Sequence, residues 1–351
     1  MKSKERVLRA INRQDTDRVP FGIFGTSTEN EERIKRYIGA RTIEDMYREI
    51  GIDIWYIQSP LKYVGEKRYY QGEEADFWGI PDSVYKDGDS SMRCPLRDVS
   101  SIDEVESYKW PSVDDFDGSL LEKEIDEHSD FAILGGVWAP IFHNVTWLCG
   151  FENTLANLIL QPEVSEAIIR RVTDFWVDYT RKTLELGKGK IDIIENCNDF
   201  GAQNGLIMSP GLFRKFFKPA LKRLYDVIKE YDVKVMQHCC GSILPIIPDF
   251  IEIGVDIINP VQVSAAGMDM EVLAKNFGDK ITFYGGIDTQ HVLPEGPIER
   301  IREETRKAID ILGEKGGYIL GPSQGLEPDI PVEHILAMFD EGKKYSGKCN
   351  C

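Results

Sequence analysis

The sequence predicts an α/β fold, a (β/α)₈ TIM barrel, from three observations. Short apolar runs alternate with helix-length segments along most of the 351 residues, which is the pattern of parallel strands joined by right-handed crossovers. There are about eight such runs, and eight strands fit the usual barrel of ~250 residues plus insertions. The alternative, an open doubly wound sheet, requires a glycine-rich phosphate turn after its first strand, and the first apolar run has none.

Each expected strand is a short apolar run that ends at glycine or at polar residues. In chain order the runs are Val19–Phe24, Ile52–Ile57, Phe131–Gly136, Ile191–Asn196, Val233–Gln237, Val255–Asn259, Ile281–Tyr284 and Tyr318–Leu320. The expected helices have apolar residues at helical spacing. They span residues 4–12, 29–38, 42–49, 150–158, 162–186, 210–231, 244–253, 270–277, 297–312 and 332–345.

The alternation of strands and helices weakens between Lys62 and Asp114, where turn residues mix with aromatic residues. We expect a single barrel domain over residues 1–351, distorted by an irregular insertion at about 62–114. The insertion is expected to contain a hairpin and to cover one end of the core. Within it, Ser101 precedes Asp103 and Glu104, which predicts a capped helix from Ser101 to Tyr108.

The charge balance limits the classes of partner. Lys and Arg number 42 against 59 Asp and Glu, for a formal net charge of -17, and this balance repels nucleic-acid backbones. No apolar run approaches the ~20 residues of a membrane span, and the amino-terminal segment lacks the pattern of a signal peptide. We therefore expect a cytoplasmic protein whose seven cysteines are thiols or ligands and not disulfides.

A barrel enzyme places its site at the carboxyl ends of its strands, and the most informative end is that of Val233–Gln237. His238 and Cys240 follow it, one residue apart, so in extended backbone their side chains share a face. Imidazole and thiolate together suit zinc, and a catalytic zinc takes three protein ligands and one open position. The alternative is a small buried cysteine beside a hydrogen-bonded core histidine.

Polar residues also follow the other strands, although loops at strand ends are polar in any protein. Those that we take as candidates are Asp199, Gln203, Asn259, Gln262, Asp288 and Gln324.

Several stretches together carry a family resemblance. They are Asp199–Gly205, Ser209-Pro210, His238–Gly241, Asn259–Gln262, Gly285–Asp288 and residues 316–331. With them the chain resembles the uroporphyrinogen decarboxylase superfamily, and within it the corrinoid-dependent methyltransferase branch. The resemblance covers nearly the whole chain and implies a distorted (β/α)₈ barrel, in agreement with the strand pattern.

The resemblance also allows two activities of the superfamily to be distinguished. True uroporphyrinogen decarboxylases have a Met-Arg-Gln-Ala-Gly-Arg stretch near the amino terminus, whose arginines hold the substrate carboxylates. This chain has Phe21–Gly25 in that region, and Ser323–Gly325 where those enzymes have Gly-His-Gly. Because a polycarboxylate is poorly bound without an arginine clamp, tetrapyrrole decarboxylation is not expected.

The methyltransferase branch holds zinc with His-x-Cys and a distant cysteine. His238 and Cys240 match the first two ligands, and Gln324 stands where the distant cysteine is expected. Glutamine is a neutral and harder ligand that binds zinc more weakly. Glu195 is a candidate either for an anionic ligand or for a general base or hydrogen-bonded wall residue. Cys197, like Cys239, is expected to pack in the core.

The remaining candidates concern the substrate. We take Glu195 and Asp199 as candidate catalytic residues, and Asp199 and Gln203 as residues that could orient a polar acceptor. The other wall candidates are Asn259, Gln262, Asp288 and Gln324. Each of these side chains has the alternative role of satisfying loop backbone.

The expected function is methyl transfer between a corrinoid, carried by a separate protein, and a small thiol or folate-type acceptor at a zinc site. The alternatives are a metal-independent decarboxylase or lyase of the same fold, and a non-catalytic barrel that docks a corrinoid protein. Neither nucleic acid nor a membrane is an expected partner.

Overall fold

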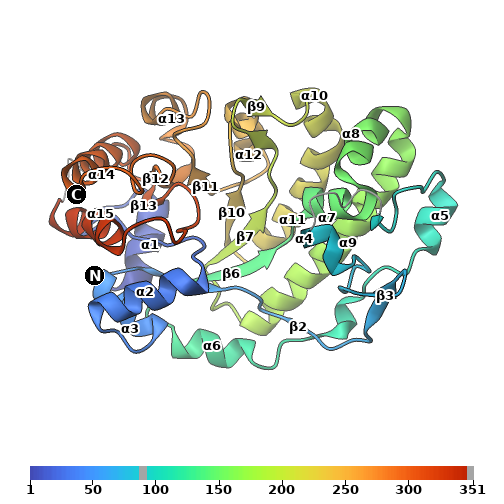
Figure 1. Cartoon of the computed structure of the whole chain (residues 1–351), viewed down its shortest axis with the longest axis horizontal. Helices are drawn as coiled ribbons and strands as arrows, with labels where there is room; N and C mark the ends of the chain where they lie inside the picture. Colours follow the sequence, from blue (N-terminus) through green and yellow to red (C-terminus); the bar gives the residue numbers. More distant parts are fainter. Residues whose placement is uncertain (87–92, 346–351) are drawn as a thin grey trace.

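A parallel sheet forms the centre of the computed structural model, which describes residues 1–86 and 93–345 (Figure 1). The seven strands follow the order β1-β6-β7-β10-β11-β12-β13, and all neighbours are parallel. Their bounds are β1 Ile54–Ile57, β6 Ala132–Trp138, β7 Ile193–Cys197, β10 Lys234–His238, β11 Ile257–Val261, β12 Thr282–Ile287 and β13 Tyr318–Pro322. The apolar runs from Ile52 onward are thus confirmed as strands of one barrel.

The predicted first strand is reduced to a single bridge that closes the ring. Phe21 bridges Leu320 of β13, and on its other side its carbonyl accepts the backbone N–H of Asp53, just before β1, at 2.9 Å. Pro20 has no N–H to extend the ladder toward β13, and the N–H of Phe21 is taken by the Asp53 side chain at 2.8 Å. The ring therefore closes at this bridge without a regular strand.

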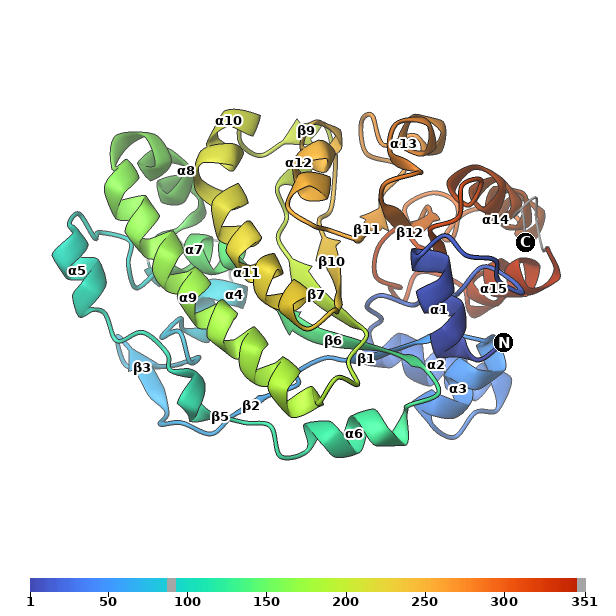
Figure 2. The same cartoon turned by 180° about the vertical axis from the view of Figure 1, so that it is seen from behind.

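The amino-terminal end of the ring is filled by helix α1 (Ser3–Ile11). Its residues Val7 and Ile11 belong to a separate buried cluster inside the ring, and α1 contacts β1, β6 and β13 (Figure 2). Inward-facing residues of all seven strands complete this cluster: Ile54, Ala132, Leu134, Ile193, Met236, Ile257, Tyr284 and Ile319. A site inside the ring is consequently reached from the carboxyl ends of the strands.

The larger apolar core lies between the sheet and the helices outside it. The helices α2 and α3 near the amino terminus contact α15 near the carboxyl terminus, which brings both ends of the chain together (Figure 1). Further bounds are α2 Thr28–Ile38, α3 Ile43–Ile50, α8 Phe151–Leu160, α9 Pro162–Gly187, α10 Pro210–Leu212, η3 Phe213–Phe217, α11 Lys218–Glu230, η4 Leu244–Ile246, α12 Ile247–Glu252, α13 Met270–Phe277, α14 Ile298–Leu312 and α15 Val332–Lys344. All of the predicted outer helices are present.

Outside the insertion, two helices were not predicted, α6 (Leu121–Glu127) and α7 (Ile141–Cys149). Helix α7 is buried at most of its positions, so it has no polar face and no amphipathic stripe from which a helix can be recognised. In the described part of the chain, no helix is both long and apolar enough to cross a membrane.

The insertion contains the predicted hairpin and the predicted capped helix. Its elements are β2 Lys62–Tyr63, β3 Arg68–Tyr70, β4 Glu73–Ala75, α4 Asp82–Lys86, α5 Ile102–Ser107, η2 Val113–Asp115 and β5 Phe116–Asp117. Strands β3 and β4 are antiparallel, and Ser101 caps α5. Trp78 packs on Phe175 of α9, while the N–H of Leu96 donates to Leu148 of α7 at 2.7 Å. The insertion thus covers α9 and reaches α7, which follows β6 at the carboxyl end.

Candidate functional site

The candidate site begins with His238, the last residue of β10. Its Nδ1 lies 2.8 Å from the side-chain carbonyl oxygen of Asn259 on the neighbouring strand β11, so Nδ1 carries the proton and donates it. Nε2 then presents its lone pair, and it lies 3.2 Å from Sγ of Cys240. This contact agrees with the shared face expected of His-x-Cys. Burial lowers the pKa of His238, which keeps the ring neutral and able to bind a cation.

A carboxylate lies on the other side of His238. Asp199, just after β7, accepts the backbone N–H of Cys240 at 2.7 Å, and its carboxyl oxygens lie 3.5 Å from Nε2 of His143 and 3.9 Å from Nε2 of His238. Burial acts to raise the pKa of Asp199, but the hydrogen bond to His143, the nearby ring of His238 and the backbone N–H of Cys240 lower it to about 2. Asp199 is therefore ionised at neutral pH.

A cysteine completes this group of ligand-type side chains. Cys197 pairs with His238 in the parallel register of β7 and β10, and it is buried. One ligand atom each of Cys197, Asp199 and His238 lies within 4.8 Å of the other two. The expectation that Cys197 only packs in the core took no account of strand alternation: residues 193, 195 and 197 of β7 share one face, and Ile193 on that face lies inside the ring.

Glu195 lies one step deeper inside the ring. It is fully buried, and the Tyr56 hydroxyl donates to its Oε2 at 2.6 Å. Its other carboxyl oxygen has no hydrogen-bond partner among the described residues. Burial raises the pKa of Glu195 to about 8, against the opposing effect of the Tyr56 hydrogen bond. A carboxyl group that is protonated at neutral pH is a weak anionic ligand, which favours the wall or acid–base alternative for Glu195.

Gln324 contacts the site from the last strand end. Its side-chain amide nitrogen donates to Sγ of Cys240 at 2.9 Å, and its amide oxygen accepts the backbone N–H of Gly325 at 3.1 Å. Beside it lies a cavity of about 230 Å³. The cavity is lined by Gln262, Thr289, Gln290, Gln324, Gly325, Glu327, Asp329 and Ile330, and it provides room for a small polar molecule beside Gln324.

The remaining candidates support loops at the mouth. Gln262 accepts the N–H of Gly241 at 2.8 Å and donates to the side chain of Gln203 at 3.2 Å. Gln203 is exposed. Asp288 accepts the N–H of Gln290 at 2.8 Å, so its side chain stabilises the turn after β12. The structure thus brings Glu195, Asp199, Asn259, His238, Cys240 and Gln324 to one place, with Gln203 and Gln262 beside them and Asp288 in a supporting loop.

Three residues at the site were not chosen from the sequence: Tyr56, His143 and Phe24. Tyr56 lies two residues after the inward-facing Ile54, so strand alternation identifies it. His143 comes from α7, which the sequence pattern did not reveal. The ring of Phe24, from the segment before β1, lies 4.5 Å from the ring of His238.

Comparisons with known proteins decide the family. A model of the uroporphyrinogen decarboxylase (URO-D) family matches residues 92–345, well over half of the chain. The chain belongs to the uroporphyrinogen decarboxylase family. The predicted resemblance is thereby confirmed, and the chain is an enzyme of this family.

The relatives include two activities. The methylcobamide:CoM methyltransferase MtbA of Methanosarcina acetivorans is 23% identical over 97% of this chain and 98% of its own length. The uroporphyrinogen decarboxylase of Chloroherpeton thalassium is 22% identical over 72% of this chain and 71% of its own length. A solved methyltransferase from Methanosarcina mazei covers 98% of this chain and 99% of its own, with a TM-score of 0.59 and 16% identity, and so has the same fold.

Proposed function

We propose that this enzyme transfers a methyl group between a corrinoid, carried by a separate protein, and a small thiol or folate-type acceptor. The observation that carries the proposal is the contact between Nε2 of His238 and Sγ of Cys240 at the mouth of the barrel. A methyltransferase relative that aligns over nearly the full length of both chains supports the same activity.

The donor atoms at this site fit a zinc ion. The imidazole nitrogen of His238 has a free lone pair, and the sulfur of Cys240 lies beside it, which is the nitrogen and sulfur chemistry that zinc selects. Among the described residues, no Lys or Arg side chain hydrogen-bonds or ion-pairs with Cys197, Asp199, His238 or Cys240, so a cation would supply the positive charge that this group lacks. A bound zinc ion would lower the pKa of an acceptor thiol toward neutrality.

The side chains around the metal position have supporting roles in this proposal. Asn259 holds the ring of His238 with Nε2 directed at the metal position. Asp199 fixes the backbone of Cys240 through its N–H. The cavity beside Gln324 would receive the acceptor. In this proposal the corrinoid comes from a partner protein.

A second candidate is a metal-independent decarboxylase. The buried, protonated carboxyl group of Glu195 favours it, since a carboxylic acid inside an apolar ring can deliver a proton. The ring of Phe24 opposes it, because Phe24 packs on His238 in the region where true decarboxylases hold substrate carboxylates with arginine.

The decisive experiment incubates anaerobically purified enzyme with methylcobalamin and with coenzyme M or tetrahydrofolate as acceptor. We expect demethylation of the corrinoid, visible in its absorption spectrum, together with methylated acceptor. Removing metal with a chelator should abolish the reaction, and zinc should restore it. If no acceptor is methylated by the metal-replete enzyme, the proposal is wrong. Decarboxylation that survives chelation would establish the second candidate.

A further inference from the structure

Cys197 lies where a metal ligand would be expected, and the family resemblance does not assign it one. It stands opposite His238 in the register of β7 and β10, and His238 stands opposite Asn259 in the register of β10 and β11. Residues opposite each other on neighbouring parallel strands direct their side chains to the same face. The three side chains therefore form a row across the inner face, with the thiol of Cys197 and the amide of Asn259 on either side of the imidazole.

Two of the separations between the donor atoms are close to those around a tetrahedral ion. Donors at ~2.0–2.3 Å from zinc lie roughly 3.3–3.8 Å from one another. Nε2 of His238 is 3.2 Å from Sγ of Cys240 and 3.9 Å from the carboxylate of Asp199. Cys197, Asp199 and His238 each offer an atom within 4.8 Å of the others. Cys240 is not part of that group of three, so closing a coordination shell around an ion requires side-chain movement.

Gln324, at the position of the family's distant cysteine, is engaged in another way. Its amide nitrogen donates to Sγ of Cys240, and its amide oxygen, the only atom that could bind a metal, accepts the N–H of Gly325. A hydrogen bond from an amide to a ligand sulfur tunes that sulfur and does not replace a ligand. The second sulfur must then come from elsewhere in the chain.

The neighbouring cysteine provides a natural comparison. Cys239 is fully buried, and its sulfur accepts the backbone N–H of Phe200 at 3.2 Å. It precedes Cys240 and follows His238, so in extended backbone it faces away from both. Cys239 and Cys197 are both buried, the first just after β10 and the second at the end of β7, yet only Cys197 is grouped with His238 and Asp199.

We infer that Cys197 supplies the second thiolate of a metal centre formed with His238 and Cys240, whose fourth position stays open for the acceptor. This inference rests on the proposed function for its choice of zinc, and it assigns the ligand that Gln324 cannot provide. Binding displaces the protons of both thiols to solvent, and the two thiolates then balance the divalent charge.

The test uses the full chain with its metal removed and cobalt(II) added under anaerobic conditions. Sulfur-to-cobalt charge-transfer absorption reports the number of thiolate ligands. We expect one cobalt ion per chain with the absorption of two thiolates. In Cys197→Ser and in Cys240→Ser half of that absorption should remain, and affinity should fall by about tenfold or more. Cys239→Ser and Gln324→Ala should retain the two-thiolate band.

The reverse pattern would overturn the assignment. An unchanged band in Cys197→Ser, or loss of one thiolate in Cys239→Ser, shows that Cys197 is not a ligand. If a variant does not fold, X-ray absorption of the zinc-loaded native chain counts sulfurs without any substitution: two are expected, and one contradicts the inference. Methyl transfer from methylcobalamin is assayed separately. Two thiolates without methyl transfer would remove the proposed function and leave the ligand assignment in place.

Discussion

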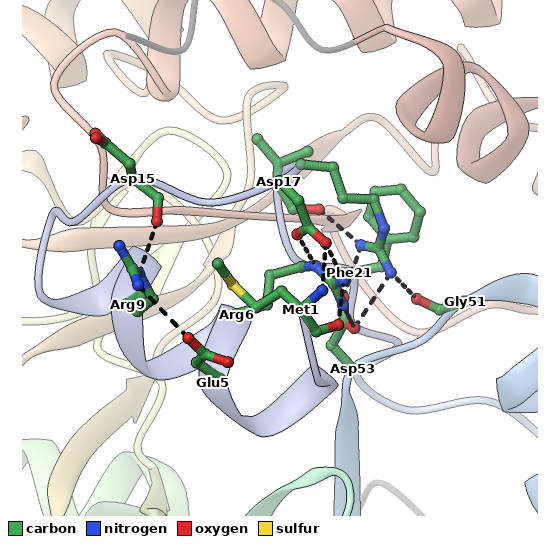
Figure 3. A network of polar contacts seen from close by, with 11 residues as sticks. Met1, Glu5, Arg6, Arg9, Asp15, Asp17, Phe21, Gly51 and Asp53 are labelled. Atoms are coloured by element: carbon green, nitrogen blue, oxygen red, sulfur yellow. Dashed lines mark hydrogen bonds and ion pairs between the residues drawn. The ribbon is translucent and has the colours of Figure 1, made fainter. Parts of the chain in front are cut away.

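The two ends of the barrel differ in whether their buried polar groups have hydrogen-bond partners. At the amino end, the fully buried Asp53 accepts hydrogen bonds from both terminal nitrogens of Arg18, from Arg6 and from the N–H of Phe21 (Figure 3). Arg6 also pairs with Asp17. At the carboxyl end, an oxygen of Glu195, both amide atoms of Asn196 and the amide nitrogen of Asn259 have no partner among the described residues.

This difference indicates that the two ends of the barrel have different roles. A polar network in which each member is satisfied makes its region rigid, and the network at the amino end ties α1 to the bridge that closes the ring. Buried polar groups without partners cost free energy, and natural proteins retain such costs mainly at functional sites. Stability should therefore respond chiefly to changes at the amino end, and metal binding and activity to changes at the carboxyl end.

The largest expected effect comes from Asp53→Ala. This change leaves the guanidinium groups of Arg6 and Arg18 close together without their shared anion, and breaking such a buried group should cost about 3–5 kcal/mol. Urea unfolding measures the loss, and methyl transfer per folded molecule should be unchanged. The control is Asp15→Ala, since the Asp15 side chain is exposed and only its backbone oxygen contacts Arg9. Equal losses of stability in Asp53→Ala and Asp15→Ala would contradict the different roles of the two ends.

The opposite pattern is expected for His238→Ala. Removing the proposed metal ligand should reduce methyl transfer by about 100-fold or more, while leaving the buried side-chain oxygen of Asn259 without its donor should cost about 1–3 kcal/mol of stability. Methylcobalamin turnover and urea unfolding measure the two quantities. His291, exposed at the same end, is the matched control. A His238→Ala variant that unfolds readily but transfers methyl groups normally would contradict the role expected of the carboxyl end.

A smaller effect at the carboxyl end is expected for Asn259→Ala. The imidazole of His238 loses the partner that fixes its proton on Nδ1, so metal affinity should fall by about tenfold. Competition with a chromophoric chelator measures the change. Asn196→Ala is the control, because no hydrogen bond of the Asn196 amide is present in the described structure. Similar losses of metal affinity in both variants would mean that the hydrogen bond from His238 to Asn259 does not contribute to metal binding.

The smallest effect concerns the pH dependence at the amino end. The hydrogen bond from Arg6 lowers the pKa of Asp17, which is partly exposed. A lowered folded-state pKa stabilises the fold above the unfolded value of ~3.9 and loses that contribution as pH falls toward the folded value. Asp17→Asn should therefore cost up to about 1 kcal/mol at pH 7, and this difference should vanish in strong acid. Urea unfolding at several pH values measures it, and a constant difference would exclude the ion pair as its cause.

The sequence revealed most of the fold because strands buried on both faces are continuous apolar runs, as in Ala132–Trp138. Helix α7 was missed because it is buried on nearly every side. At the site, the spacing of His238 and Cys240 was sufficient to predict their contact. The position of Cys197 was available from alternation with Glu195, but the network around Asp53 was not, because Arg6, Asp17 and Arg18 resemble ordinary surface charges until the ring closes.

Helix α1 has a consequence for the order of events in the proposed reaction. Because α1 fills the amino end of the ring, the interior has its entrance on the side of His238 and Cys240. In the proposed reaction, a small acceptor and a large corrinoid protein must then use the same opening of the barrel. The acceptor has to enter before the protein partner covers the mouth, and its methylated product leaves only after that partner departs. Such a barrel would show compulsory-order kinetics, with excess corrinoid protein inhibiting the enzyme by trapping the empty site.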